Sequence, residues 1–150
     1  SLVARLVPCH EDAEELVQDA FISGFNHIGS FLGHASFHTW ISRIAYPCAI
    51  SHLRRQRITY VEIDERTPVT DAEIDDVMAD SRRAELLERA IDRLRPDEKT
   101  LLTLYYYDNM PMKDIAYITG IEPGNVATKL HRIRKKLYLI IKKDDNGERI

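Results

Sequence analysis

Cysteine is scarce in this chain of 150 residues, which has only Cys9 and Cys48, and no secretory signal pattern opens it. Two such thiols fit a reducing cytoplasm better than a secreted domain held by disulfides. The apolar runs are far too short to cross a bilayer, so we expect no membrane insertion. Strand-like alternation of useful length is also missing, and no segment repeats. These absences predict a cytoplasmic, all-α protein.

The chain also lacks the motifs that catalysis and metal binding require. No nucleophile–base pairing and no Gly-rich phosphate loop is recognisable. His34 and His38 are four positions apart, and Cys9, His10 and His27 are further candidate ligands, but no CxxC or HExxH spacing supports a metal site. We therefore expect a protein that is not an enzyme and that uses no metal or cofactor.

What the chain has instead is a segregated distribution of charge. The formal net charge is only −3, yet the two signs occupy different segments. Residues 59–80 hold eight acids against Arg66 alone, whereas residues 126–143 hold seven Lys and Arg and no acid. A third block is basic again and contains Arg43, Arg54, Arg55 and Arg57. Because the acids lie in a separate segment, the basic blocks keep a local positive field that suits a polyanion.

Apolar residues recur at helical spacing in two regions of the chain. The first region covers two predicted helices, within residues 11–24 and 37–53, separated by the loop GSFLGHAS. The second begins near residue 82 and continues to residue 143. The polar, acidic stretch between them predicts a flexible linker, with a helix near its end. We predict two small helical domains, residues 1–58 and 82–143, joined by the linker 59–81 and followed by a tail, 144–150.

Residues 111–137 have the order of a helix-turn-helix. Pro111 and Pro123 suit the first turns of two helices, and Gly120 can take the positive φ that ends the first one. The buried stripe of the second helix is expected to be Val126, Leu130, Ile133 and Leu137. Polar side chains of types that contact base edges or phosphates remain outside this stripe: Asn125, Thr128, Lys129, Arg132, Lys135 and Lys136. The alternative is a solvated basic face on an ordinary helical hairpin.

Several blocks of the chain together resemble bacterial sigma factors. Their second conserved region resembles EDAEELVQDAF (11–21), SFLGHASFHTWISRIA (30–45) and HLRRQR (52–57), and their fourth region resembles residues 86–137. Two such regions with a short linker resemble the extracytoplasmic-function (ECF) group. The resemblance implies a subunit without catalysis that docks on core RNA polymerase, directs it to promoter DNA and helps to open the duplex. It also implies an anti-sigma partner that clamps both domains.

The resemblance further implies roles for individual residues. The motif that binds the polymerase clamp helices corresponds to Asp12, Glu15, Gln18 and Asp19. The upstream (−35) promoter element is read by the second helix of the helix-turn-helix. The downstream (−10) element is contacted by residues that correspond to Phe31, Gly33, His34, Ser36, Phe37, Arg43, Arg54 and Arg55. Aromatic, Gly and small polar residues suit a flipped base, and Arg suits the phosphates. For the predicted polymerase contacts, the alternative is a solvated acidic helix face. For the loop, the alternative is a plain connection whose phenylalanines lie in the core. We expect Trp40 to lie in the core.

The chain departs from the family pattern at Pro47, where a polar residue, often Asn, is usual. Proline removes the N–H that would bond the Arg43 carbonyl, at a cost of ~3 kcal/mol or a kink, and offers no side-chain donor. We therefore expect an unusual reading of the downstream element. Residues 1–10 resemble the remnant of a truncated or partly disordered first helix. Two other functions remain open: a stand-alone helix-turn-helix regulator with a dimerising or sensing N-terminal domain, and a helical protein-interaction module without a DNA role.

Overall fold

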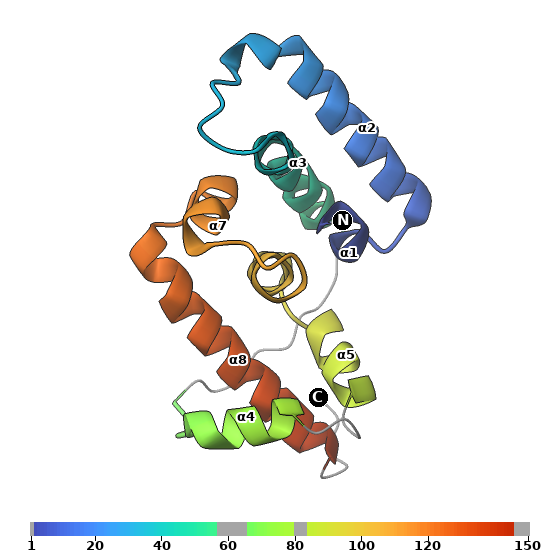
Figure 1. Ribbon diagram of the computed structural model, residues 1–150. Helices are drawn as coiled ribbons and strands as arrows, with labels where there is room; N and C mark the ends of the chain where they lie inside the picture. Colours follow the sequence, from blue (N-terminus) through green and yellow to red (C-terminus); the bar gives the residue numbers. More distant parts are fainter. Residues whose placement is uncertain (1, 57–65, 80–83, 146–150) are drawn as a thin grey trace.

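The computed structural model describes residues 2–56, 66–79 and 84–145, and this part of the chain is helical without strands (Figure 1). The prediction of an all-α protein is therefore confirmed. The N-terminal helices are α1 (Leu2–Leu6), α2 (His10–Asn26) and α3 (Phe37–Arg54), with the 3-10 turn η1 (Ile28–Ser30) between the last two. The others are α4 (Asp71–Ala79), α5 (Ala84–Asp92), α6 (Pro96–Leu102), the π-helical segment η3 (Thr103–Tyr107), α7 (Met112–Thr119) and α8 (Pro123–Asp145). Within the described ranges, no helix combines the length and apolarity that a membrane span needs.

The N-terminal domain is a helical pair, α2 and α3, with α1 packed against both. A Cβ on Gly24 of α2 would lie 2.6 Å from the Cδ1 atom of Ile41, so glycine permits the close approach of these helices. Trp40 is 8% exposed, which confirms its predicted place in the core. Helix α3 begins at a side-chain cap, because the Thr39 amide donates to Ser36 Oγ over 3.1 Å. The helix then continues through Pro47, which lies on its exposed side.

The C-terminal domain is arranged around α8, which contacts α5, α6 and α7 (Figure 1). Gly120 has φ 75° and ends α7, and Pro123 is the first residue of α8, so both predicted helix boundaries are confirmed. Pro111 lies one residue before α7 and is its N-cap. The stripe predicted for the second helix is buried in full, and it extends to Ile140 and Ile141. These local features produce the predicted helix-turn-helix.

The two domains pack directly against each other, a contact that the sequence did not predict. Helix α7 lies against α3, and α1 lies against α6 and η3. Two arginines of the N-terminal domain stack on tyrosines of the C-terminal domain. The guanidinium carbon of Arg5 lies 3.6 Å from the centroid of the Tyr107 ring, and that of Arg43 lies 4.4 Å from the Tyr117 centroid. The structure therefore shows a closed arrangement of the domains.

The described part of the predicted linker contains α4, the helix expected near its end. Its apolar side chains Ile74 and Val77 are 1% and 4% exposed, and the helix packs against α8. The rest of the predicted linker, residues 59–65 and 80–81, lies outside the described residues, as does Arg57. Where it is described, the acidic segment is thus attached to the C-terminal domain.

Candidate nucleic-acid interface

The first half of α8 presents the polar face that the helix-turn-helix pattern predicts. Asn125, Thr128, Lys129 and Arg132 are all exposed, and their spacing of three, four and seven residues places them on one side of the helix. The tight turn at Gly120 and the packing of α7 on α8 hold this side away from the core. The structure therefore brings these four predicted residues together on one accessible surface. Lys135 lies further along the helix and is half-buried.

Lys136 does not belong to this surface, contrary to its prediction as a DNA contact. The residue is 6% exposed, and its Nζ atom donates to Glu98 Oε1 of α6 over 2.8 Å. It lies three residues after Ile133 and beside Leu137, so it projects toward the buried side of α8. Glu98 meanwhile accepts a hydrogen bond from the Arg95 amide at the start of α6. An ion pair in this position joins two helices and leaves no ammonium group for phosphate.

The loop predicted to capture a base holds a cluster of three aromatic rings. The Phe31 centroid lies 5.3 Å from that of Trp40 and 5.9 Å from that of Phe37. Phe31 is half-buried, whereas Phe37 is 46% exposed, so the cluster has one open aromatic side. Gly33 has φ 77° and is exposed in the same loop, as is His34. Ser36 is engaged as the cap of α3.

The predicted arginines of α3 divide into two groups. Arg54 and Arg55 are exposed at the C-terminal end of the helix. Arg43 is exposed as well, but it is stacked on Tyr117 of α7 and so belongs to the domain contact. The packing of the two domains also affects Tyr46 of α3. Burial and then the negative charge of Asp97 on α6 raise the pKa of its hydroxyl. One of the three arginines is therefore held between the domains.

The acidic residues of α2 line a groove of about 450 Å³ against α3. Asp12, Glu15 and Asp19 form one wall, whereas Gln18 is exposed outside the lining. The facing wall comes from α3 and its C-cap and consists of Pro47, Cys48, Ser51, His52 and Arg55. Sequence reasoning assigned Arg55 and Pro47 to the downstream element and missed the other three. His52 Nε2 lies 3.4 Å from Asp12 Oδ2, so Asp12 also links the two helices. Among the described residues, no three potential ligands lie close enough to hold a metal ion.

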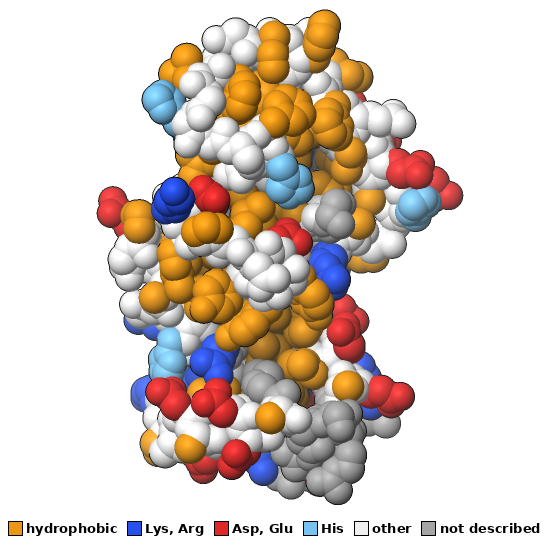
Figure 2. Space-filling view, viewed as in Figure 1, with side chains coloured by type: hydrophobic (Ala, Val, Ile, Leu, Met, Phe, Trp, Pro, Cys, Tyr) orange, Lys and Arg blue, Asp and Glu red, His pale blue; other side chains and the backbone are white. Residues whose placement is uncertain are grey.

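Sequence reasoning also missed an exposed apolar patch at the end of α2 (Figure 2). Its side chains are between 46% and 79% exposed: Phe21, Ile22, Phe25, Ile28, Leu32 and Phe37. Five of them, all except Leu32, border one shallow depression. Phe21 continues the apolar spacing of α2, which favours the core, yet half of it faces solvent. The sequence did contain a signal for this patch, because Ile22 and Phe25 are apolar but lie off the buried stripe of the helix.

Comparison with known families places these surfaces in context. The family model for Sigma-70 region 2 matches residues 1–58, and that for Sigma-70 region 4 matches residues 84–137. The RNA polymerase sigma factor YlaC of Bacillus subtilis is 30% identical over 144 residues, which cover 93% of this chain and 83% of YlaC. The chain belongs to the sigma-70 family.

Further relatives agree with this membership. The ECF RNA polymerase sigma-E factor of Escherichia coli K12 is 27% identical over 155 residues, which cover 91% of this chain and 77% of that protein. A solved structure, of the sigma factor RpoE in complex with the anti-sigma factor NepR from Bartonella quintana, matches with a TM-score of 0.66. The sigma factor in that structure is 21% identical to this chain. The match covers 95% of this chain and 89% of the solved one, which shows a shared fold.

The comparisons confirm the resemblance to ECF sigma factors and the function as an RNA polymerase sigma factor. They do not favour a stand-alone regulator. The relatives are named as sigma factors and not as enzymes. The domain boundaries and the individual contact residues of this sigma factor stay predictions.

Proposed function

We propose that this sigma factor divides transcription initiation among three surfaces. The acidic side of α2 binds core RNA polymerase, the first half of α8 contacts the upstream promoter element, and α3 with its preceding loop contacts the downstream element. The observation that carries the proposal is the exposed row Asn125, Thr128, Lys129 and Arg132 on the second helix of a helix-turn-helix. The protein has no catalysis of its own and acts in the cytoplasm, where core polymerase works.

The row on α8 has the chemistry of a major-groove reader. An α-helix about 10–12 Å wide fits a major groove about 12 Å wide. Arg132 and Lys129 can donate to guanine or to phosphate, and Asn125 can pair with adenine by donating and accepting at once. These residues span two turns of one exposed side, so one insertion brings them all to the DNA. The charges of Lys129 and Arg132 also supply attraction that depends on salt.

The groove between α2 and α3 supports the docking surface for polymerase. Glu15 and Asp19 are exposed carboxylates on one wall, and no cation faces them at salt-bridge distance among the described residues. Such a surface fits a basic helix of a partner, because complementary charge steers encounter and sets orientation. Asp12 is partly engaged by His52, which leaves Glu15 and Asp19 as the main contacts.

The downstream surface combines the ring cluster with the arginines of α3. An unstacked base can stack on the open side of Phe37, while Arg54 and Arg55 attract the strand's phosphates. Pro47 lies on the exposed side of α3 and offers only apolar contact. Arg43 is exposed but stacks one face of its guanidinium on Tyr117, so a contact with DNA that needs that face competes with the contact between α3 and α7.

The proposal also includes an anti-sigma partner. The similar sigma factor RpoE of Bartonella quintana was solved in complex with the anti-sigma factor NepR. By analogy, a regulator of this chain clamps both domains and keeps them from polymerase.

The experiment that tests the proposal is co-elution of the full chain with bacterial core RNA polymerase on a sizing column at moderate salt. We expect a stable complex that the charge reversal Asp19→Lys weakens. The double variant Lys129→Ala/Arg132→Ala should still co-elute but should lose binding to the upstream element. A chain that runs alone or as its own dimer, and binds duplex specifically without polymerase, would instead indicate a stand-alone regulator. Unchanged promoter binding by the double variant would remove α8 from the proposal.

A further inference from the structure

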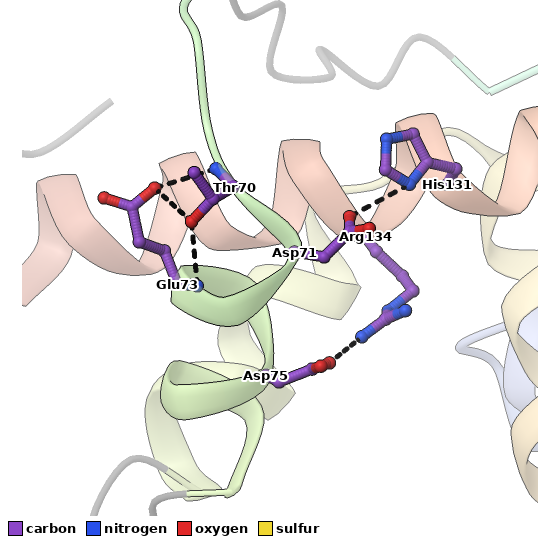
Figure 3. Close-up of polar contacts among 6 residues, drawn as sticks. All are labelled: Thr70, Asp71, Glu73, Asp75, His131 and Arg134. Carbon is purple, nitrogen blue, oxygen red and sulfur yellow. Dashed lines mark hydrogen bonds and ion pairs between the residues drawn. The ribbon is translucent and has the colours of Figure 1, made fainter.

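The acidic helix α4 packs across the basic helix α8, although the two are separated by the whole of α5–α7 in the chain (Figures 1 and 3). Its sequence DAEIDDVMA places the apolar residues Ile74 and Val77 at helical spacing. This pair is almost completely buried in the contact with α8. The acidic residues lie around it: Asp71, Glu73, Asp75 and Asp76, all exposed. Helix α4 therefore packs on α8 through its apolar residues and carries exposed carboxylates around that contact.

The start of α4 is defined by a reciprocal cap. The Thr70 amide and hydroxyl donate to Glu73 Oε2 over 2.8 and 2.9 Å, and the Glu73 amide donates to Thr70 Oγ1 over 3.2 Å (Figure 3). A helix of nine residues is nevertheless too short to be stable alone in water. Its persistence therefore depends on the contact with α8. A segment of this kind belongs to the parts of a protein that open at low cost in free energy.

An imidazole–carboxylate contact and an ion pair join α4 to α8, in the turns of α8 at the C-terminal end of the DNA-facing row (Figure 3). His131 Nδ1 lies 3.6 Å from Asp71 Oδ1, and an Arg134 guanidinium nitrogen donates to Asp75 Oδ1. Figure 2 shows acidic side chains over α4 beside basic ones of α8. Docking of α4 therefore neutralises part of the positive charge that α8 would present to phosphates.

The position of these pairs along α8 also matters. His131 and Arg134 lie only about 9–14 Å from Asn125 along the helix axis, at a rise of about 1.5 Å per residue. A major groove about 12 Å wide admits one helix about 10–12 Å wide and has no room for a second helix on its flank. The docked α4 would also bring its carboxylates toward the phosphates of the groove wall. Both the negative charge of α4 and its volume therefore oppose the binding of DNA to this part of α8.

We propose that α4 is an internal competitor of DNA for α8. In the docked state it contacts His131 and Arg134 on one flank of α8, and duplex DNA binds α8 fully only after α4 leaves. The inference rests on the proposed DNA role of α8 and adds a device that keeps the free chain from binding DNA tightly. Any contact that draws α4 away raises the affinity of α8 for DNA.

The test compares three single variants of the full chain by fluorescence anisotropy with a mixed-sequence duplex about three helical turns long, at ionic strength of about 0.1 M. Ile74→Ala removes an apolar anchor without changing charge. Asp75→Asn removes the partner of Arg134. Asp76→Asn removes the same charge from the next residue, for which the described part of the chain shows no ion pair with α8. We expect Ile74→Ala and Asp75→Asn to bind about threefold more tightly or better, because they raise the fraction of undocked chain. Asp76→Asn should change the affinity for the duplex by less than half of the change that Asp75→Asn causes.

A second measurement follows α4 itself. Amide hydrogen exchange of residues 71–79 should accelerate when the duplex is added to the wild-type chain, because DNA displaces the helix. Unchanged protection with DNA bound would overturn the proposal. So would wild-type affinity in Ile74→Ala, or equal effects of Asp75→Asn and Asp76→Asn.

A control variant separates this proposal from the DNA role on which it rests. The double variant Lys129→Ala/Arg132→Ala should lose binding to the same duplex. If it does, while Ile74→Ala binds like the wild type, α8 keeps its role and the competition by α4 is rejected. If the double variant binds like the wild type, the face assigned to DNA is wrong and the competition falls with it.

Discussion

Arg43 of α3 stacks its guanidinium on the ring of Tyr117 of α7, with 4.4 Å between the guanidinium carbon and the ring centroid. One residue comes from the surface predicted to meet the downstream promoter strand, and the other from the first helix of the helix-turn-helix. The contact therefore joins the two domains through a side chain that DNA would also use. In the closed arrangement, one face of the Arg43 guanidinium is occupied by the Tyr117 ring.

This pair predicts a measurable coupling between the domains. In a double-mutant cycle with Arg43→Ala and Tyr117→Ala, we expect the free energies of unfolding to show a coupling of about 0.5–1 kcal/mol, the usual range for a partly exposed cation–π contact. Urea denaturation of the four proteins measures it. Tyr117→Phe is the matched control, because it keeps an aromatic face and should retain most of the coupling. Strict additivity of the two single variants would contradict the contact.

The ion pair between Lys136 and Glu98 predicts a stability defect without a DNA defect. Lys136→Met should lower the free energy of unfolding by about 3 kcal/mol, because it leaves the carboxylate of Glu98, whose side chain is only 16% exposed, without its cation. Lys129→Met, on the exposed side of the same helix, should change stability by less than about 0.5 kcal/mol and weaken DNA binding. Chemical denaturation and duplex binding of both variants distinguish the two roles.

A further variant checks the cause of that defect. The double change Lys136→Met/Glu98→Gln removes the uncompensated charge, so it should recover part of the stability lost in Lys136→Met. A defect that does not shrink in the double variant, or a loss of DNA binding specific to Lys136→Met, would return Lys136 to the DNA surface.

The cap of α4 predicts a loss of that helix in acid. Hydrogen bonds from the Thr70 amide and hydroxyl lower the pKa of Glu73 below its ordinary value of 4.5. Since the folded pKa is the lower one, the cap contributes fully above a pH of about 4.5 and is lost as pH falls through the folded pKa. Backbone chemical shifts of residues 71–79 should follow this titration. The variant Glu73→Gln should remove the step, and a step that survives in it would belong to another group.

The sequence by itself determined the features that depend on neighbouring residues. The spacing of Val126, Leu130, Ile133 and Leu137 predicted the buried stripe of α8, because residues three and four apart share one side of a helix. Gly120 predicted the end of α7, because glycine permits a positive φ. Pro123 predicted the start of α8, because proline fixes φ near the helical value. The order of such local signals was enough to predict two helical domains. The family was predicted from the resemblance of longer blocks, such as residues 11–21 and 86–137, to sigma factors.

Only the tertiary structure decided which polar side chains remain available. Lys136 and Arg132 are both basic residues of one helix, yet Glu98 of α6 meets the first and solvent meets the second. Arg134 is paired by Asp75, and Arg43 is stacked on Tyr117, through contacts between segments far apart in the chain. Helical periodicity tells which side of a helix is buried. What covers the flanks of that side depends on how distant helices pack, and no local pattern contains that information.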